Sequence, residues 1–357
     1  MTATAAVLGL AGPAGSVTPA PPEFYGVATS TDLSRDDFNR LARANIRTVR
    51  FTIYWPAVHN QAGHKHYWHN VDNFVLNAAA ARINLIPTLI GTPKTFSEDP
   101  FRPPLDSGSE RKAWQGFVRS AVQRYGPRGS LWREVKQCPP FGWCHPDLPF
   151  MPIRVWQAWN EPNLGIFWKP TPSPTEYAEL LELTGDAVHS VEPNAEVITG
   201  GIMPGGEGAK NAISQNDFIA RLYQSGVSES FDGVDLHPYE KKPKGVRQLV
   251  ADARSLMQVY GDAAEPLWIT EVGWSTAGPK NHERVTSRKK QGKFLSKTMK
   301  MLTSQRAALG LRLASWFTYR DAPFLGCDWC GGAGMLDGKL KPKPAWKKYV
   351  EVTGGLP

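Results

Sequence analysis

Two glutamates stand at the ends of apolar segments that have the character of buried strands. Glu161 lies in the stretch VWQAWNEPN, and Glu271 lies in LWITEVGW. Two carboxyl groups that face one cleft about 5–5.5 Å apart can hydrolyse a glycosidic bond, one as nucleophile and the other as acid and then base. A lone glutamate at a strand end is more often an ion-paired surface residue. Two of them, each in an apolar and aromatic setting, favour the catalytic interpretation.

The elements that must position these glutamates alternate regularly along the chain. Short apolar runs, typical of strands buried on both faces, are separated by segments with helical spacing. The expected strands are 25–28, 48–54, 85–90, 154–159, 196–201, 233–237, 267–270 and 313–318. Eight such units predict an α/β fold, a single-domain (β/α)8 TIM barrel with its active site at the carboxyl ends of the strands. Glu161 and Glu271 then end the fourth and seventh strands, on facing sides of the barrel mouth.

A doubly wound open sheet is the alternative fold. It would normally carry a glycine-rich phosphate turn after its first strand, and the corresponding stretch here, Gly26-Val-Ala-Thr-Ser, has no GxGxxG pattern. The sequence also contains no P-loop and no internal repeat.

The motif Asn160-Glu161-Pro162 after the fourth strand, with Glu271 ending the seventh, resembles glycoside hydrolase clan A. The segments 156–163 and 268–275 are most similar to bacterial enzymes around family 39, with family 5 as the second choice. The resemblance covers roughly residues 24–350. It implies a retaining O-glycosyl hydrolase that cleaves a β-type bond, with Glu161 as acid/base and Glu271 as nucleophile.

Further roles follow from the same resemblance. Arg50 ends the second strand and is expected beside Glu271, where its charge helps keep that carboxylate ionised. Asn160 resembles the residue that binds the sugar 2-hydroxyl. In the His-x-Tyr motif, Tyr239 would donate its hydroxyl to Glu271 and His237 would line the cleft. Trp316, on the eighth strand, resembles the sugar platform of the clan.

The chain has 13 tryptophans, which is a large number for a core of this size, and flat indole faces are surfaces on which sugar rings stack. Trp55, Trp168 and Trp274 follow strand ends and are candidate walls of the sugar site, although each is equally compatible with packing. Four histidines, His59, His64, His66 and His69, crowd the loop after the second strand. Their spacing matches no metal site, so we expect a polar loop that lines the cleft, and no metal.

Residues 1–22 combine a short apolar run with a Gly/Pro/Ala/Ser segment, which is typical of a signal-peptide remnant or a flexible linker. Residues 23–357 form the expected catalytic domain, and we expect a secreted or cell-surface protein. The cysteines form two close pairs, Cys138 with Cys144 and Cys327 with Cys330, each able to close a local disulfide in an oxidising compartment. A zinc site of all four is disfavoured, because the strand order puts the pairs at opposite ends of the barrel.

The remaining composition excludes several classes of protein. No run of about 18 apolar residues exists, which argues against a membrane span. The net charge of +8 comes from basic residues spread along the chain, with no arginine-rich arm or zinc-finger spacing, so nucleic acid is not an expected partner. We expect a monomer that binds a carbohydrate and needs no cofactor. A non-catalytic carbohydrate-binding barrel at the cell surface, and a transglycosylase that uses the same residues, remain the alternatives.

Overall fold

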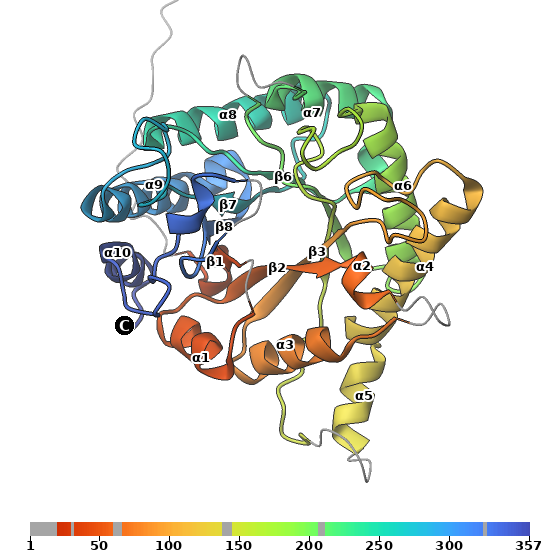
Figure 1. Cartoon of the computed structure of the whole chain (residues 1–357), viewed down its shortest axis with the longest axis horizontal. Coiled ribbons are helices and arrows are strands. Elements are labelled where there is room, and N and C mark those ends of the chain that lie inside the picture. Colours follow the sequence, from red (N-terminus) through yellow and green to blue (C-terminus); the bar gives the residue numbers. More distant parts are fainter. Residues whose placement is uncertain (1–19, 30–31, 60–65, 138–144, 206–210, 324–326) are drawn as a thin grey trace, which may run out of the picture.

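The computed structural model describes residues 20–29, 32–59, 66–137, 145–205, 211–323 and 327–357. In this part the chain forms one (β/α)8 barrel, as the sequence predicts, with helices outside a ring of parallel strands (Figure 1). The strands are β1 (Tyr25–Ala28), β2 (Thr48–Tyr54), β3 (Asn84–Ile90), β4 (Val155–Ala158), β5 (Glu196–Thr199), β6 (Val234–Leu236), β7 (Leu267–Val272) and β8 (Leu311–Phe317).

Hydrogen bonds between β5 and β6 complete the barrel. The paired strands run in the order β5-β4-β3-β2-β1-β8-β7-β6, so these two lie at the ends of the sheet. Just beyond β5, the Ile202 amide donates to the Asp235 carbonyl, and the His237 amide donates to the Ile202 carbonyl, both at 3.0 Å. This closure brings β4 and β7 to opposite sides of one mouth.

The helices begin at sequence signals that satisfy their free amide groups. Five of them start after a serine whose hydroxyl accepts a backbone N–H of the first turn, and Ser34 forms a capping box with Asp37. The helices are α1 (Arg35–Arg43), α2 (Trp55–Val58), α3 (His69–Ala80), α4 (Gly108–Tyr125), α5 (Ser130–Gln137), α6 (Pro174–His189), α7 (Gln215–Gln224), α8 (Pro243–Val259), α9 (Arg288–Leu309) and α10 (Pro344–Thr353).

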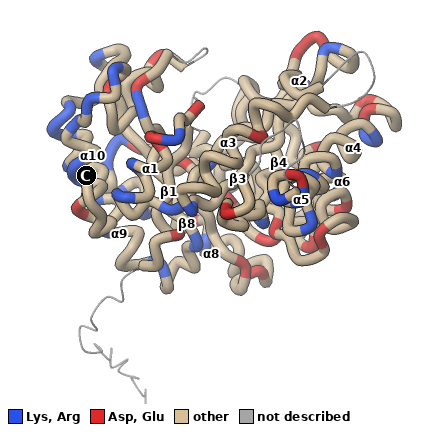
Figure 2. Tube along the Cα trace, turned by 90° about the horizontal axis from the view of Figure 1, so that it is seen from below, with Lys and Arg blue, Asp and Glu red and all other residues tan. Residues whose placement is uncertain are grey.

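The strand predictions are confirmed to within two residues at every boundary. Helix α5 was not predicted, because it is short and lies within the Pro-rich stretch 125–152. Residues 1–19, His64, Cys138 and Cys144 lie outside the described residues. In the described part, no helix is long and apolar enough to cross a membrane. Figure 2 shows many basic residues on the outer helices, around α9 and α10.

Gly91 follows β3 and decides how Tyr54, at the end of β2, can lie. Its φ is +94°, a conformation that favours glycine. A Cβ atom at this position would lie 2.5 Å from Cε2 of Tyr54 and 2.9 Å from Cδ of Pro56. The glycine therefore leaves the space that the Tyr54 ring occupies at the barrel mouth.

We predict that Gly91→Ala lowers the free energy of unfolding by about 1–3 kcal/mol, because it adds backbone strain and a contact with Tyr54. Gly116→Ala is the matched control. Gly116 lies inside α4 with nothing near its missing Cβ, so alanine there should raise stability by roughly 0.5–1 kcal/mol. Urea denaturation followed by circular dichroism measures both. Equal stability of Gly91→Ala and the wild type would contradict this account.

Candidate active site

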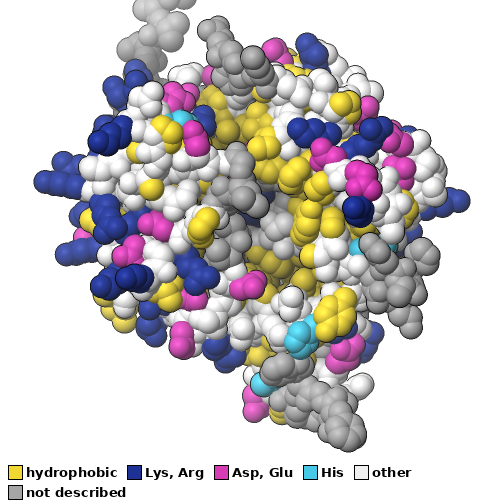
Figure 3. Space-filling model, viewed as in Figure 1, with side chains coloured by type: hydrophobic (Ala, Val, Ile, Leu, Met, Phe, Trp, Pro, Cys, Tyr) yellow, Lys and Arg dark blue, Asp and Glu magenta, His cyan; other side chains and the backbone are white. Residues whose placement is uncertain are grey.

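A cavity of about 420 Å³ opens at the carboxyl ends of the strands, where a barrel of this kind places its active site. Arg50, Asn160, Glu161, Tyr239 and Glu271 supply its polar wall. Hydrophobic side chains gather across the centre of this face in Figure 3. The structure thus brings five of the residues singled out in the sequence into one apolar hollow.

The turn after β4 directs two consecutive side chains into the cavity. In a regular strand, neighbouring residues point to opposite faces. Trp159 and Glu161 instead have φ of +68° and +43°, and Asn160 and Glu161 both line the cavity. The buried Asn163 amide holds this turn by donating to the carbonyls of Met203 and Ile213, at 2.9 and 2.8 Å. Left-handed backbone at non-glycine residues costs about 1–3 kcal/mol each, and such strain is concentrated at functional sites.

Arg50 connects three strands beneath the cavity. Its Nε donates to Gln157 Oε1 on β4 at 2.8 Å, and its Nη2 donates to Asn160 Oδ1 at 2.6 Å. Its Nη1 forms an ion pair with Glu271 Oε1 on β7. Because the arginine and the glutamate are both buried, each charge depends on the other for compensation.

Glu271 has a second partner on its other oxygen. The Tyr239 hydroxyl donates to Glu271 Oε2 at 2.6 Å, the contact expected from the His-x-Tyr motif. Glu271 therefore faces a cation on one oxygen and a hydroxyl donor on the other.

Glu161 has a very different environment. It is 8% exposed, and its Oε1 lies 2.7 Å from Nδ1 of His237, which is fully buried. His237 therefore does not line the cleft as expected but lies behind Glu161. Gly201 makes room for the imidazole, since a Cβ at that position would overlap the ring.

Hydrogen bonds on the far side of the imidazole determine its tautomer. His237 Nε2 lies 3.0 Å from Thr270 Oγ1, and Thr270 donates its single hydroxyl proton to Asp235 Oδ2 at 2.5 Å. Thr270 must then accept a proton from Nε2, which leaves Nδ1 unprotonated. Since Nδ1 faces a carboxyl oxygen at 2.7 Å, the proton between them belongs to Glu161.

Asp235 is held by donors on both oxygens. The Thr270 amide donates to Oδ1 at 2.9 Å, and Gln157 Nε2 donates to Oδ2. Burial raises the pKa of Asp235 to about 8, against the bonds from Thr270 and the charge of Arg50. The three donors on its two oxygens favour the carboxylate, the form that accepts the Thr270 hydroxyl proton. Because Gln157 also accepts from Arg50, a continuous chain of buried hydrogen bonds runs from Glu271 through Arg50, Gln157, Asp235, Thr270 and His237 to Glu161.

Burial supports the same assignment of protons. It raises the pKa of the Glu161 carboxyl to about 7, against the opposing charges of Arg50 and Arg284. Burial also lowers the pKa of the His237 imidazole to about 3, although the charge of Glu271 acts in the other direction. Below about pH 7 the pair is therefore a carboxyl group that retains its proton beside a neutral imidazole.

Among the described residues, Glu161, His237 and Glu271 form a group whose geometry could hold a metal ion. One ligand atom from each lies within 4.8 Å of the other two. The Arg50 guanidinium is already paired with Glu271 and would repel a cation there. Hydrogen bonds and the ion pair with Arg50 already explain why these three side chains lie together. We therefore interpret the group as a pair of catalytic carboxyl groups with a supporting histidine.

The tryptophans singled out in the sequence do not line the cavity, and this corrects the prediction. Trp316, Trp55, Trp168 and Trp274 are at most 1% exposed. Trp316 packs on Trp274 with ring centroids 6.0 Å apart and donates to the Ala333 carbonyl, whereas Trp55 stacks on Phe117. Their indoles are core, and they have no free face for a sugar.

The described histidines of the loop after β2 do not line the catalytic cavity, which corrects a second prediction. His66 packs against Trp68 and Phe117, and burial beside His59 lowers its pKa to about 4. His69 begins α3 and contacts Asn73. None of the three described histidines of this loop lines the catalytic cavity, and among described residues they form no metal-ligand cluster.

Other aromatic side chains form the wall instead, and sequence reasoning missed them. Phe317 lies one position beyond Trp316 on β8 and lines the cavity, as does Trp329. The Cys327–Cys330 disulfide, one of the two expected pairings, closes the short loop that carries Trp329. Tyr239 meets the Trp329 ring edge-on, and the Arg284 guanidinium lies 5.5 Å from its centre. The sequence signal that could have identified Trp329 is its position between Cys327 and Cys330, because a short disulfide loop holds the residue between its cysteines in place.

Comparison with known proteins agrees with the barrel fold. A β-xylosidase of Geobacillus stearothermophilus is 47% identical over 47 residues, which is 13% of this chain and 9% of that enzyme. A family 39 glycoside hydrolase from Bacteroides cellulosilyticus WH2 superposes over 94% of this chain and 65% of its own, with a TM-score of 0.69 and 20% identity. The chain shares its fold with glycoside hydrolases.

Two further solved structures show the same barrel. A monomeric β-xylosidase from Caulobacter crescentus CB15 matches 93% of this chain and 68% of its own, with a TM-score of 0.62 and 21% identity. A glucosidase from Croceicoccus marinus matches 95% and 69%, with a TM-score of 0.70 and 14% identity. This chain therefore spans about two thirds of the length of these structures. No family model matches it.

We predict that His237 is neutral and protonated on Nε2 between about pH 5 and 8. Nitrogen-15 NMR of labelled imidazole groups distinguishes the two ring nitrogens, with His237→Asn used to assign the signal. Thr270→Val removes the acceptor at Nε2 and should produce a mixture of tautomers. A wild-type imidazole protonated on Nδ1 would contradict the hydrogen-bond assignment.

Proposed function

We propose that the protein is a retaining glycoside hydrolase that cleaves a β-type O-glycosidic bond by double displacement. The observation that carries this proposal is the pair Glu161 and Glu271, with carboxyl oxygens within 4.8 Å of each other in opposite electrostatic surroundings. That separation is close to the spacing of about 5–5.5 Å in retaining enzymes and well below the 6.5–9.5 Å or so that inverting enzymes need for a water molecule.

In the first step, Glu271 attacks the anomeric carbon as Glu161 gives its proton to the leaving oxygen. The carbon–oxygen bond to the leaving group breaks, and a glycosyl ester forms on Glu271. In the second step, Glu161 takes a proton from a water molecule that attacks the same carbon. This releases the sugar with its original configuration and returns both carboxyl groups to their starting states.

The surroundings of the two glutamates suit these roles. Arg50 pairs with one oxygen of Glu271 and Tyr239 donates to the other, which orients the carboxylate for attack. Burial and the neutral His237 keep the proton on Glu161. Two carboxyl groups driven to opposite protonation states by their surroundings characterise this chemistry.

We also propose which sugar the substrate contains. Two of the similar proteins are β-xylosidases, so a β-xyloside is the first substrate to test, followed by the β-glucoside and β-mannoside. The similar enzyme from Caulobacter crescentus is a monomeric β-xylosidase, which supports a monomer here as well. The Cys327–Cys330 disulfide supports a working place outside the reducing cytosol, and free cysteine thiols in the native protein would argue against it.

We predict that Glu271→Gln and Glu161→Gln each lower kcat on a 4-nitrophenyl β-glycoside by at least about 10²–10⁴-fold. Azide should restore turnover in Glu161→Ala by replacing the water that Glu161 activates. Glu196→Gln is the matched control, because Glu196 lies on β5 and pairs with Arg312 away from the cavity.

Near-full activity in a correctly folded Glu271→Gln would contradict the proposal. Sugar binding without turnover on every glycoside tested would favour the carbohydrate-binding barrel. Transfer of the sugar to an added acceptor in preference to water would favour the transglycosylase, which needs the same two carboxyl groups.

We predict that kcat/KM falls as the pH rises above about 7, because Glu161 must carry its proton and burial holds its pKa near that value. The charged and titratable groups near Glu161 are Arg50, Arg284, His237, Tyr239 and Glu271. Arg284 lowers the pKa of Glu161, so Arg284→Gln should move this basic limb to higher pH, whereas Arg288→Gln on the outer helix α9 should not. A basic limb near pH 5 in the wild type would contradict the assignment.

A further inference from the structure

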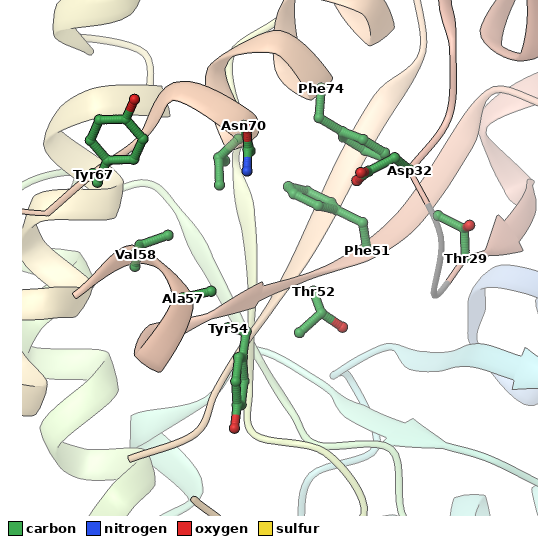
Figure 4. Close-up of a pocket in the computed structure, with 11 residues that line it drawn as sticks. Thr29, Asp32, Phe51, Thr52, Tyr54, Ala57, Val58, Tyr67, Asn70 and Phe74 are labelled. Atoms are coloured by element: carbon green, nitrogen blue, oxygen red, sulfur yellow. The ribbon is translucent and has the colours of Figure 1, made fainter. Parts of the chain in front are cut away.

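A second cavity of about 300 Å³ adjoins the catalytic cavity over the end of β2. The two cavities share Thr29, Thr52 and Tyr54 in their walls. Figure 4 shows that the side chains around the second cavity come from three segments, namely the end of β1, β2 with α2, and the start of α3. The shared wall places the two cavities side by side at the barrel mouth.

The polar groups of this second cavity are available to a ligand. Asp32, Thr52, Tyr54 and Asn70 line it. Across the described parts of the chain, none of these four side chains has a hydrogen bond or ion pair within the protein. They offer a carboxylate, two hydroxyls and an amide within one cavity.

The apolar part of the lining has the character of a sugar-binding surface. Phe51 and Phe74 are buried and stack on each other with ring centroids 4.6 Å apart, so they form the apolar base and leave Tyr67 as the ring that a ligand can reach. The Tyr67 ring stands at the rim and is 65% exposed, although large aromatic side chains are usually covered. Aromatic faces that pack on C–H groups, together with polar groups that bind hydroxyls, suit a pyranose ring.

Charge narrows the class of ligand. The lining contains one carboxylate and no lysine or arginine, so an anionic sugar has no partner there. The basic residues of α9 and α10 lie on an outer surface and do not reach this cavity (Figure 2).

We propose that this cavity binds a further neutral sugar unit of the substrate, so that the protein acts on β-linked oligosaccharides of two or more units. The inference rests on the proposed glycosidase function and adds the substrate class to it. Tyr54 joins the two sugar positions, with its ring in the space left by Gly91. Thr52 lies between them on β2, on the same strand face as Arg50.

The test compares long and short substrates. The probes are xylotetraose, cellotetraose and mannotetraose, each paired with the 4-nitrophenyl β-glycoside of the same sugar. Tyr67→Ala and Asn70→Ala change only the second cavity, and Phe150→Ala, an exposed aromatic residue outside both cavities, is the matched control. We expect Tyr67→Ala to lower the ratio of kcat/KM on the tetrasaccharide to kcat/KM on the aryl glycoside by about tenfold, with a smaller fall for Asn70→Ala and none for Phe150→Ala.

A binding measurement separates this inference from the proposed function. Calorimetric titration of the same tetrasaccharides into Glu161→Gln should show binding that Tyr67→Ala weakens about tenfold. If aryl glycosides are hydrolysed but no tetrasaccharide binds more tightly than its monosaccharide, the inference is overturned and the function stands. If tetrasaccharides bind through Tyr67 and nothing is hydrolysed, the function fails and the sugar site stands. An equal effect of Tyr67→Ala on long and short substrates would also overturn the inference.

Discussion

The buried guanidinium of Arg50 is the interaction on which the rest of the site depends. It lies on β2 and contacts side chains at the ends of β4 and β7, so one cation links three strands across the barrel. A charge this far from water needs partners, and Gln157, Asn160 and Glu271 provide them. Because Glu271 is equally buried, its ion pair with Arg50 also compensates the negative charge of the carboxylate at the centre of an apolar mouth.

The hydrogen bonds that leave Arg50 explain how two glutamates so close together differ. Glu271 lies at the charged end of the chain of contacts, next to the cation. Glu161 lies at the other end, after Gln157, Asp235, Thr270 and a neutral His237. Like charges this close would raise each other's energy, and placing the proton on Glu161, which faces the neutral His237 and not a cation, relieves that repulsion. The barrel strands fix the positions of Glu161 and Glu271, so the different surroundings of the two glutamates are a consequence of the fold.

The barrel and the two glutamates could be predicted because they depend on local pattern. Strand periodicity and strand ends are visible in the residues, and a barrel brings strand ends together. The aromatic wall could not be predicted, because both faces of a barrel strand are covered and a shift of one residue exchanges them. Trp316 and Phe317 are adjacent on β8, yet only Phe317 reaches the cavity. The partners Asp235 and Thr270 were missed because their role appears only when β6 and β7 are side by side.

The central claim is that Glu271 forms the covalent bond and Glu161 moves the proton. A 2-deoxy-2-fluoro-β-glycoside with a good leaving group slows release of the glycosyl-enzyme, so the intermediate can be digested and examined by mass spectrometry. We predict one fluoroglycosyl group on the peptide that contains Glu271 and none on the peptide that contains Glu161. Attachment to Glu161, or turnover that releases a sugar of inverted configuration with no adduct, would contradict the account.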